Sequence, residues 1–170
     1  RDAARSALSV APDEELVFAV GRLVRKKGFE YLIDAVARLA PSRPRLVAVV
    51  AGAGDLDAEL RARAASRGVG DRVRFPGLLP HDRTAAVMAA ADVVAVPSVR
   101  DDAGNVDGLP NVVLEALATA TPVVATPAGG IGAVLDDGIN GRLVPERDAS
   151  ALAAAIADLL DAPEAARAMG

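Results

Sequence analysis

The chain has 170 residues, of which 52% are hydrophobic and 25% charged, with a formal net charge of −4. A chain of this size fits one compact domain that buries enough apolar surface to fold without disulfides or a structural metal. It has no cysteine and one histidine, which excludes disulfides, zinc–thiolate centres and multi-histidine metal sites, and its acidic balance and 2% aromatic content argue against nucleic-acid binding.

Short apolar runs alternate with stretches of helical periodicity along the chain. In chain order the predicted elements are a strand over Leu16–Val20, a helix over Phe29–Leu39, a strand over Leu46–Ala51, a helix from an N-cap at Asp55 to about Arg67, a strand over Val73–Phe75, a helix over His81–Ala91, a strand over Asp92–Val96, a loop over Ser98–Pro110, a helix over Asn111–Thr119, a strand over Pro122–Ala125, a strand near Arg142–Val144 and a last helix over Ala149–Leu160, capped by Asp148 or Ser150. Strands separated by helices of this length predict parallel crossovers. Residues 1–170 are therefore predicted to form a single α/β domain, a Rossmann-like doubly wound parallel sheet of about six strands. In such sheets ligands bind at the carboxyl ends of the strands, near the switch in strand order.

A basic loop, GRLVRKKG at residues 21–28, follows the first predicted strand and holds the only two lysines of the chain. A glycine lets a ligand approach the backbone, and the start of the next helix offers free N–H groups to an anion. Fixed cations beside a helix start suit a diphosphate, although a solvated basic loop accounts for the same residues. The segment lacks the G-x-x-x-x-G-K-[ST] pattern of a Walker loop.

A Gly-x-Gly turn, Gly52 to Gly54, follows the second predicted strand. The third glycine of a dinucleotide fingerprint is missing, because position 57 is aspartate. The turn permits close approach of a ligand or of another domain, but a plain tight turn explains it equally.

The most specific element is DGLPNVVLE at residues 107–115. Asp107 lies in the predicted loop, and a second acid, Glu115, lies one turn inside the following helix. The helix N-terminus favours phosphate, and an acid further along can accept hydrogen bonds from vicinal sugar hydroxyls. An ordinary helix-start acid is the simple alternative for Glu115, but its apolar neighbours favour a functional role.

These motifs occur in an order that resembles one known family. The order is Gly21-Arg22-x4-Lys27-Gly28, Gly-x-Gly, Pro97-Ser98, acid-x7-acid, Thr121-Pro122-Val123-Val124 and Gly129-Gly130. It is similar to the nucleotide-sugar-binding C-terminal half of retaining GT-B-fold glycosyltransferases of family 4 (glycosyl transferases group 1), from about Leu16 to Leu160.

The resemblance implies a role for several residues near the strand ends. Arg22 and Lys27 would hold the donor diphosphate, and together with Asp107, which would contact the transferred sugar, they would form the catalytic set. Glu115 would bind the ribose hydroxyls, and the segment Arg74–Leu79 would line the base pocket, largely through its backbone. The residues implied to bind the donor are Gly21, Arg22, Lys27, Gly52, Gly54, Phe75, Gly77, Gly108, Leu109, Pro110, Asn111, Val112 and Glu115.

The resemblance also implies what the enzyme needs and where it works. No cofactor or metal would be required, because Arg22 and Lys27 would stabilise the departing nucleotide, and the donor would be a UDP-, GDP- or ADP-sugar. The acceptor would be held by an N-terminal domain absent from this chain, which begins at Arg1 rather than Met and is interpreted as an excerpt of a longer cytoplasmic enzyme. Alone it is expected to be weakly active or inactive, and any contact with the inner face of a membrane would be made by the absent domain. The high alanine and arginine content favours a bacterial source.

Three positions depart from the family pattern. Asp107 stands where glutamate is usual, Ala120 where glycine is common, and Ala133 where glutamate commonly follows the Gly-Gly turn. Two other functions therefore stay open, a non-catalytic sugar-nucleotide-binding module and a nucleotide-sugar epimerase. The epimerase would need a positioned acid and base, and the one histidine, His81, is interpreted as a surface residue at a helix start. The adjacent acids Asp101 and Asp102 are interpreted as solvated loop carboxylates rather than metal ligands.

Overall fold

Six parallel strands form one sheet in the computed structural model of the chain, which describes residues 1–169. Along the sheet the strands lie in the order β3 (Val73–Arg74), β2 (Leu46–Ala51), β1 (Glu15–Val20), β4 (Val93–Val96), β5 (Val123–Ala125) and β6 (Arg142–Leu143). Each neighbouring pair is parallel. The strand order reverses between β1 and β4, so the predicted doubly wound parallel sheet is confirmed.

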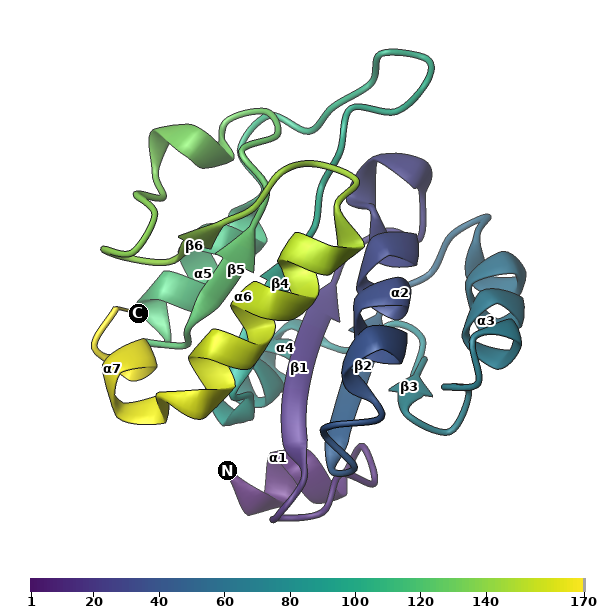
Figure 1. Ribbon diagram of the computed structural model, residues 1–170, viewed down its shortest axis with the longest axis vertical. Helices are drawn as coiled ribbons and strands as arrows, with labels where there is room; N and C mark the ends of the chain where they lie inside the picture. The colour runs from purple at the N-terminus through teal and green to yellow at the C-terminus, as the bar shows by residue number, and fades with distance from the viewer. Residues whose placement is uncertain (170) are drawn as a thin grey trace.

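Helices cover both faces of this sheet (Figure 1). One core cluster joins the sheet to α2 (Phe29–Leu39), α3 (Asp57–Ser66), α6 (Ala149–Asp161) and α7 (Pro163–Arg167). The other joins it to α1 (Asp2–Ser6), α4 (His81–Ala90) and α5 (Asn111–Ala118). Two 3₁₀ turns, η1 (Arg25–Lys27) and η2 (Ile131–Ala133), lie in the loops after β1 and β5.

The central strand β1 shows why a continuous apolar run is needed here. Successive side chains of a strand point to opposite faces. Val17 and Ala19 therefore pack into one core cluster, whereas Leu16 and Phe18 pack into the other, and all four are fully buried. The same reasoning holds for β2, which pairs with β1 in register and is buried along its whole length.

The predicted elements are all present, with shifts of one or two residues at their ends. Asp148 caps α6 as expected and accepts a hydrogen bond from the Ala151 amide at 2.8 Å. The predicted N-cap at Asp55 is wrong, because α3 begins at Asp57 after Leu56 and has no side-chain cap. The short helices α1 and α7 were not predicted, since five-residue helices carry little periodic signal.

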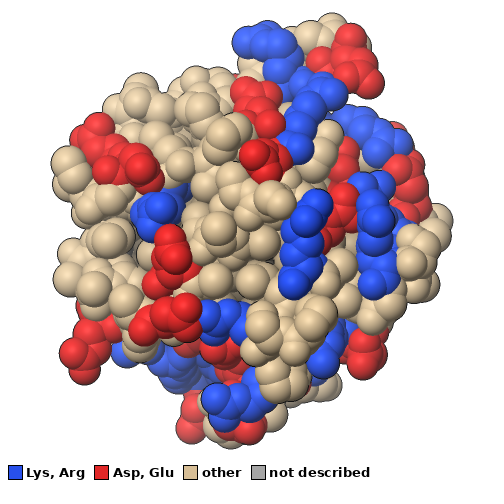
Figure 2. Space-filling view, in the orientation of Figure 1, with Lys and Arg blue, Asp and Glu red and all other residues tan. Residues whose placement is uncertain are grey.

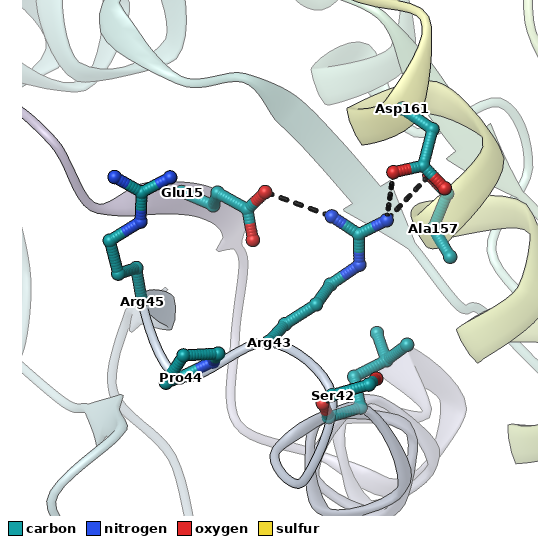
Figure 3. Close-up of a pocket in the computed structure, with 8 residues that line it drawn as sticks. Glu15, Ser42, Arg43, Pro44, Arg45, Ala157 and Asp161 are labelled. Carbon is teal, nitrogen blue, oxygen red and sulfur yellow. Dashed lines mark hydrogen bonds and ion pairs between the residues drawn. The ribbon is translucent and has the colours of Figure 1, made fainter.

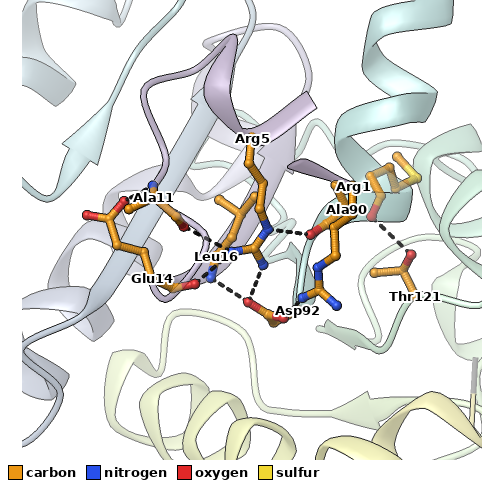
Figure 4. Close-up of polar contacts among 9 residues, drawn as sticks. Arg1, Arg5, Ala11, Glu14, Leu16, Ala90, Asp92 and Thr121 are labelled. Carbon is orange, nitrogen blue, oxygen red and sulfur yellow. Dashed lines mark hydrogen bonds and ion pairs between the residues drawn. The ribbon is translucent and has the colours of Figure 1, made fainter. Parts of the chain in front are cut away.

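A buried arginine holds α1 in place (Figure 4). Arg5 is 2% exposed and donates hydrogen bonds to the carbonyls of Ala90 at 3.0 Å and Glu14 at 2.7 Å. It also pairs with the Asp92 carboxylate at 2.7 Å, and the same carboxylate oxygen accepts the Leu16 amide at 2.8 Å. A buried guanidinium is tolerated only when its donors are satisfied, and these bonds tie the first helix to α4 and to the start of β1.

A second arginine organises the amino edge of the sheet (Figure 3). Arg43 donates to Glu15 at 2.8 Å and to the carbonyl of Ala157 at 3.2 Å, and it also pairs with Asp161. These contacts lie in a hollow of about 520 Å³ between the starts of β1 and β2 and the end of α6. The charges in the hollow largely satisfy one another, so it serves the packing of α6 and is not the predicted ligand site.

The face that carries α2, α3 and α6 has charges of both signs next to each other (Figure 2). The arginines of α3 contribute to this pattern. Arg63 donates to both carboxylate oxygens of Asp34 at 3.0 and 2.6 Å, and Arg67 donates to the same residue at 2.9 Å. Burial alone would raise the pKa of Asp34, but the two arginines outweigh it and lower that pKa below its ordinary value.

Candidate functional site

The candidate site lies where the strand order switches, between the loops that follow β1 and β4. The two loops are joined through their backbones, because the Val99 amide donates to the Lys26 carbonyl at 2.9 Å. Gly28 has φ +66°, and a Cβ on it would lie 1.9 Å from the Pro97 carbonyl oxygen. Only glycine allows this approach, so the end of the basic loop is fixed against the end of β4.

Two lysines of the basic loop pair with one carboxylate. Lys26 Nζ lies 2.9 Å from Asp107 Oδ1, and Lys27 Nζ lies 2.5 Å from Asp107 Oδ2. The three side chains are only 16 to 21% exposed. Burial by itself would raise the pKa of Asp107, but the close ion pairs with the positively charged Lys27 and Lys26 overcome it and lower that pKa below its ordinary value. The carboxylate is therefore ionised, and the group of three side chains carries one net positive charge.

Beside this cluster lies a hollow of about 350 Å³ at the carboxyl ends of the strands. Its lining residues are Val20, Gly21, Lys27, Leu79, His81, Thr84, Pro110, Asn111, Val112 and Glu115. Six of the residues implied to bind the donor are therefore brought together: Gly21, Lys27, Pro110, Asn111, Val112 and Glu115.

The N-termini of two helices converge on this hollow. His81 is the first residue of α4 and Asn111 the first residue of α5, and neither helix has a side-chain cap. The first amides of a helix have no partner within the helix and carry a partial positive charge. Together with Lys27 they make the hollow suited to an anion, with Glu115 placed to accept hydrogen bonds from hydroxyl groups.

Arg22 lies next to the hollow but is not part of its lining. It follows Gly21 at the end of β1 and is exposed. Among residues 1–169, its guanidinium makes neither a hydrogen bond nor an ion pair. This side chain is therefore not held by another contact of its own, and its role in donor binding stays a prediction.

The glycines after β2 support the basic loop from below. A Cβ on Gly52 would lie 1.8 Å from the Gly21 carbonyl oxygen, and one on Gly54 would lie 2.4 Å from that of Leu23. The Gly52 amide also donates to the Gly77 carbonyl at 2.8 Å. None of these glycines except Gly21 lines the hollow, so the contacts give Gly52 and Gly54 a packing role, and their donor contacts stay predictions.

Phe75 is also outside the lining of the hollow. Arg61 lies over its ring, with the guanidinium carbon 4.9 Å from the ring centroid, and donates to its carbonyl at 3.0 Å. Of the segment Arg74–Leu79, Leu79 lines the hollow, and the use of this segment as a base pocket stays a prediction.

The turn at Gly129 and Gly130 supports the loop that carries Asp107. The Gly130 amide donates to the Gly108 carbonyl at 2.7 Å. A Cβ on Gly129, which has φ +61°, would lie 1.9 Å from the Asp107 carbonyl oxygen. Leu109 packs against the same turn, since a Cβ added to Gly130 would lie 3.2 Å from the Cβ of Leu109. Gly108 and Leu109 are thus held beside the hollow without lining it.

Sequence reasoning missed two members of the site. Lys26 was not assigned a role, although it is one of the only two lysines in the chain and pairs with Asp107. From the sequence alone, His81 is interpreted as a surface residue at a helix start. It is exposed and begins α4 as expected, but it also lines the hollow. The sequence indicates this position only once the order of the strands in the sheet is known.

The acids at 101 and 102 order the long loop after β4. Asp101 accepts hydrogen bonds from the amides of Ala103 at 3.0 Å and Asn105 at 2.8 Å, and Asp102 pairs with Arg147 at 2.9 Å.

Within residues 1–169, no three side chains of the metal-binding types gather into a possible ion site. Over the same residues, none of the helices is both long enough and apolar enough to cross a membrane.

Fold and site together define a doubly wound α/β domain that presents a lysine and two helix N-termini at its switch point, the class of site that takes phosphate-bearing ligands. The family model described as "Glycosyl transferases group 1" matches residues 1–170. The chain therefore belongs to the glycosyl transferases group 1 family, and its sheet matches the Rossmann-like C-terminal domain of GT-B glycosyltransferases.

Named relatives and a solved structure are similar to almost the whole chain. The D-inositol 3-phosphate glycosyltransferase of Segniliparus rotundus is 38% identical over 99% of this chain and 37% of its own length. The GDP-mannose-dependent alpha-(1-6)-phosphatidylinositol monomannoside mannosyltransferase of Mycolicibacterium smegmatis is 37% identical over 93% of this chain and 42% of its own. The crystal structure of Anabaena HepE in complex with UDP-glucose has a TM-score of 0.86 and 29% identity, covering 99% of this chain and 44% of that one. The chain thus spans less than half the length of each.

Proposed function

We propose that residues 1–170 form the donor-binding C-terminal domain of a retaining glycosyltransferase of family 4, which transfers a sugar from a nucleoside-diphosphate sugar to an acceptor. One observation carries the proposal. Lys27 and the uncapped N-terminus of α5 face the same hollow at the switch point, in a chain of the glycosyl transferases group 1 family. This is the place and the charge that a donor diphosphate needs.

Each part of the donor has a matching group in this arrangement. Lys27 and Arg22 hold the diphosphate, and the first amides of α5 add hydrogen bonds to it. Glu115, half-buried beside Val112 in the lining of the hollow, accepts hydrogen bonds from the ribose hydroxyls. Asp107 contacts the transferred sugar from the neighbouring loop. The base lies toward Leu79, where backbone groups recognise it.

The chemistry asked of these residues is electrostatic. The bond between the anomeric carbon and the diphosphate oxygen breaks, and the acceptor oxygen forms a bond to that carbon on the same face, so the configuration is retained. The acceptor proton passes to the departing phosphate oxygen. Negative charge grows on the diphosphate as the bond breaks, and Lys27, Arg22 and the α5 amides are placed to stabilise it without a metal ion.

The rest of the enzyme lies outside this chain. The chain covers 37 to 44% of the three similar proteins named above. We assign acceptor binding to an N-terminal domain of the same cytoplasmic protein. Catalysis then requires the two domains to close over the donor, and residues 1–170 alone bind the nucleotide but turn over little substrate.

The donor base is left to experiment among UDP, GDP and ADP. The names of the similar proteins support more than one, since one of them is GDP-mannose-dependent and another was crystallised with UDP-glucose. The test is calorimetric titration of the chain with UDP, GDP, ADP and NAD in the absence of metal. We expect saturable binding of one nucleoside diphosphate, lost in Lys27→Met and weakened in Arg22→Met.

A matched control separates a specific effect from a general loss of positive charge. Arg45 is exposed at the amino edge of the sheet, in the hollow that holds Arg43. Arg45→Met should therefore bind the nucleotide as the parent chain does. Preference for NAD, or equal losses in Arg45→Met and Arg22→Met, would contradict the assignment.

A second function is favoured by one observation. Asp107 is a methylene shorter than glutamate and is engaged by two lysines rather than directed into the hollow. A non-catalytic sugar-nucleotide-binding module fits this arrangement. It predicts nucleotide binding without turnover even in the complete parent protein, whereas Asp107→Glu in that protein would then restore transfer.

A further inference from the structure

Lys26 and Lys27 are neighbours on one 3₁₀ turn, but their positions differ in one respect. Both ammonium groups contact the Asp107 carboxylate, at 2.9 and 2.5 Å. Only Lys27 also lines the hollow beside the N-termini of α4 and α5. Lys27 thus has access to a second anion, whereas Lys26 has Asp107 as its sole ion-pair partner within residues 1–169.

A ligand anion in the hollow competes with Asp107 for Lys27. If Lys27 turned to the ligand and nothing else held the carboxylate, a side chain that is 16% exposed would keep its charge without a partner. An unpaired, largely buried charge is strongly unfavourable. This unfavourable free energy would weaken binding of the ligand. A second cation that stays paired with Asp107 removes most of it, so Lys27 can leave the carboxylate and bind the ligand.

Backbone contacts hold Lys26 in its position beside the Asp107 carboxylate. Its carbonyl accepts the Val99 amide at 2.9 Å, and Gly28 is packed against the Pro97 carbonyl. Both contacts fix η1 against the loop that leads from β4 to Asp107. Arg25, the third cation of the turn, points elsewhere and pairs with Glu59 at 2.5 Å.

We propose that Lys26 is a positioning residue, which retains the Asp107 carboxylate when Lys27 turns to the diphosphate of the donor. The inference rests on the proposed function, and it gives the two lysines separate tasks. Lys27 binds the ligand. Lys26 never touches the ligand but sets how readily Lys27 can leave Asp107.

The test is a double-mutant cycle on diphosphate binding, with UDP, GDP and ADP as the probes in calorimetric titrations. Lys26→Met should weaken binding of the preferred diphosphate about tenfold, because Lys27 is then the only partner of Asp107. Asp107→Asn should bind at least as tightly as the parent chain. The double variant Lys26→Met/Asp107→Asn should match Asp107→Asn, so that the effect of Lys26 vanishes with the carboxylate.

Two further measurements separate positioning from a general effect. Arg25→Met removes a cation from the same turn and should leave the affinity unchanged. Carboxyl ¹³C NMR of the diphosphate-saturated chain should show a higher pKa for Asp107 in Lys26→Met than in the parent. Circular dichroism and denaturant unfolding of each variant establish that it is folded.

The outcomes distinguish this inference from the proposed function. If the parent chain binds none of the diphosphates, or if Lys27→Met binds them as the parent does, the proposed function fails and takes this inference with it. If the parent binds and Lys27→Met does not, the proposed function stands. The inference alone is then overturned if Lys26→Met binds normally, or if it weakens binding equally with and without the Asp107 carboxylate.

Discussion

Gly129 lies so close to the Asp107 carbonyl oxygen that a Cβ on the glycine would stand 1.9 Å from it. The Gly-Gly turn after β5 is therefore the support of the loop that carries Asp107, and not only a turn. Its second glycine adds a hydrogen bond, from the Gly130 amide to the Gly108 carbonyl at 2.7 Å. Residues after three different strands, β1, β4 and β5, thus determine where the Asp107 carboxylate sits.

This contact makes Gly129→Ala a test of the site. The added methyl group must displace the backbone at residues 107 and 108, so we expect diphosphate binding to fall by roughly tenfold or more while the chain stays folded. Gly138→Ala is the matched control, because Gly138 also has a positive φ, +76°, but has nothing within 4 Å of an added Cβ. Calorimetric titration compares the two, and equal affinities would show that the turn does not support the site.

The sequence was sufficient to predict the strands, the sheet class and the grouping of Lys27, Asn111 and Glu115 at one edge. The strands are continuous apolar runs because both faces are covered, and loops at the carboxyl ends of parallel strands meet at one edge. The lysine pair on Asp107 could not be predicted. It depends on the direction in which each side chain leaves a 3₁₀ turn, and residues 26 and 107 are distant in the sequence.

Helix ends were also beyond sequence reasoning where tertiary contacts decide them. Asp55 has the residue type of an N-cap, yet α3 starts two residues later. The α1 helix is held by contacts of the Arg5 guanidinium with the carbonyls of Ala90 and Glu14 and the carboxylate of Asp92. These partners lie outside the helix, so the residue pattern of the helix does not predict the contacts.

The C-terminal end of α5 predicts a stabilising substitution. Ala120 has φ +50°, and the helix closes with hydrogen bonds from the Ala120 amide to Leu117 at 3.0 Å and from the Thr121 amide to Ala116 at 3.0 Å. This is a Schellman motif, in which the left-handed residue is usually glycine. Ala120→Gly should raise the free energy of unfolding by about 1 kcal/mol, measured by urea denaturation. Ala118→Gly, at the last residue of α5, should instead lower it, by at most about 1 kcal/mol.

Removal of the buried arginine of α1 should destabilise the whole fold. Arg5→Met leaves Asp92 without its buried partner and two carbonyls without donors, so we expect a loss of about 3–5 kcal/mol in the free energy of unfolding. Arg1 also pairs with Asp92 but is 41% exposed, and Arg1→Met should cost less than about 1 kcal/mol. Similar losses for the two variants in urea denaturation would mean that the burial of Arg5 contributes little.

The pH dependence of stability should have opposite signs at two acidic residues of α2. Burial raises the pKa of Glu30, whose Oε2 atom has no hydrogen-bond partner within residues 1–169, although Arg25 opposes the shift. The pKa of Asp34 is lowered instead, because Arg63 and Arg67 outweigh its burial.

These shifts determine how each group contributes to the free energy of unfolding at different pH values. A carboxyl group with a raised pKa contributes stability that is fully present below its unfolded pKa and is lost as the pH rises through its folded pKa. A carboxyl group with a lowered pKa contributes stability that is present above its unfolded pKa and is lost as the pH falls through its folded pKa. Carboxyl groups titrate between about pH 3 and pH 7, so urea denaturation over this range measures both effects. Glu30→Gln should gain stability relative to the parent chain as the pH rises. Asp34→Asn should lose stability relative to the parent over the same range, and parallel pH profiles for the two variants would contradict this assignment of charge.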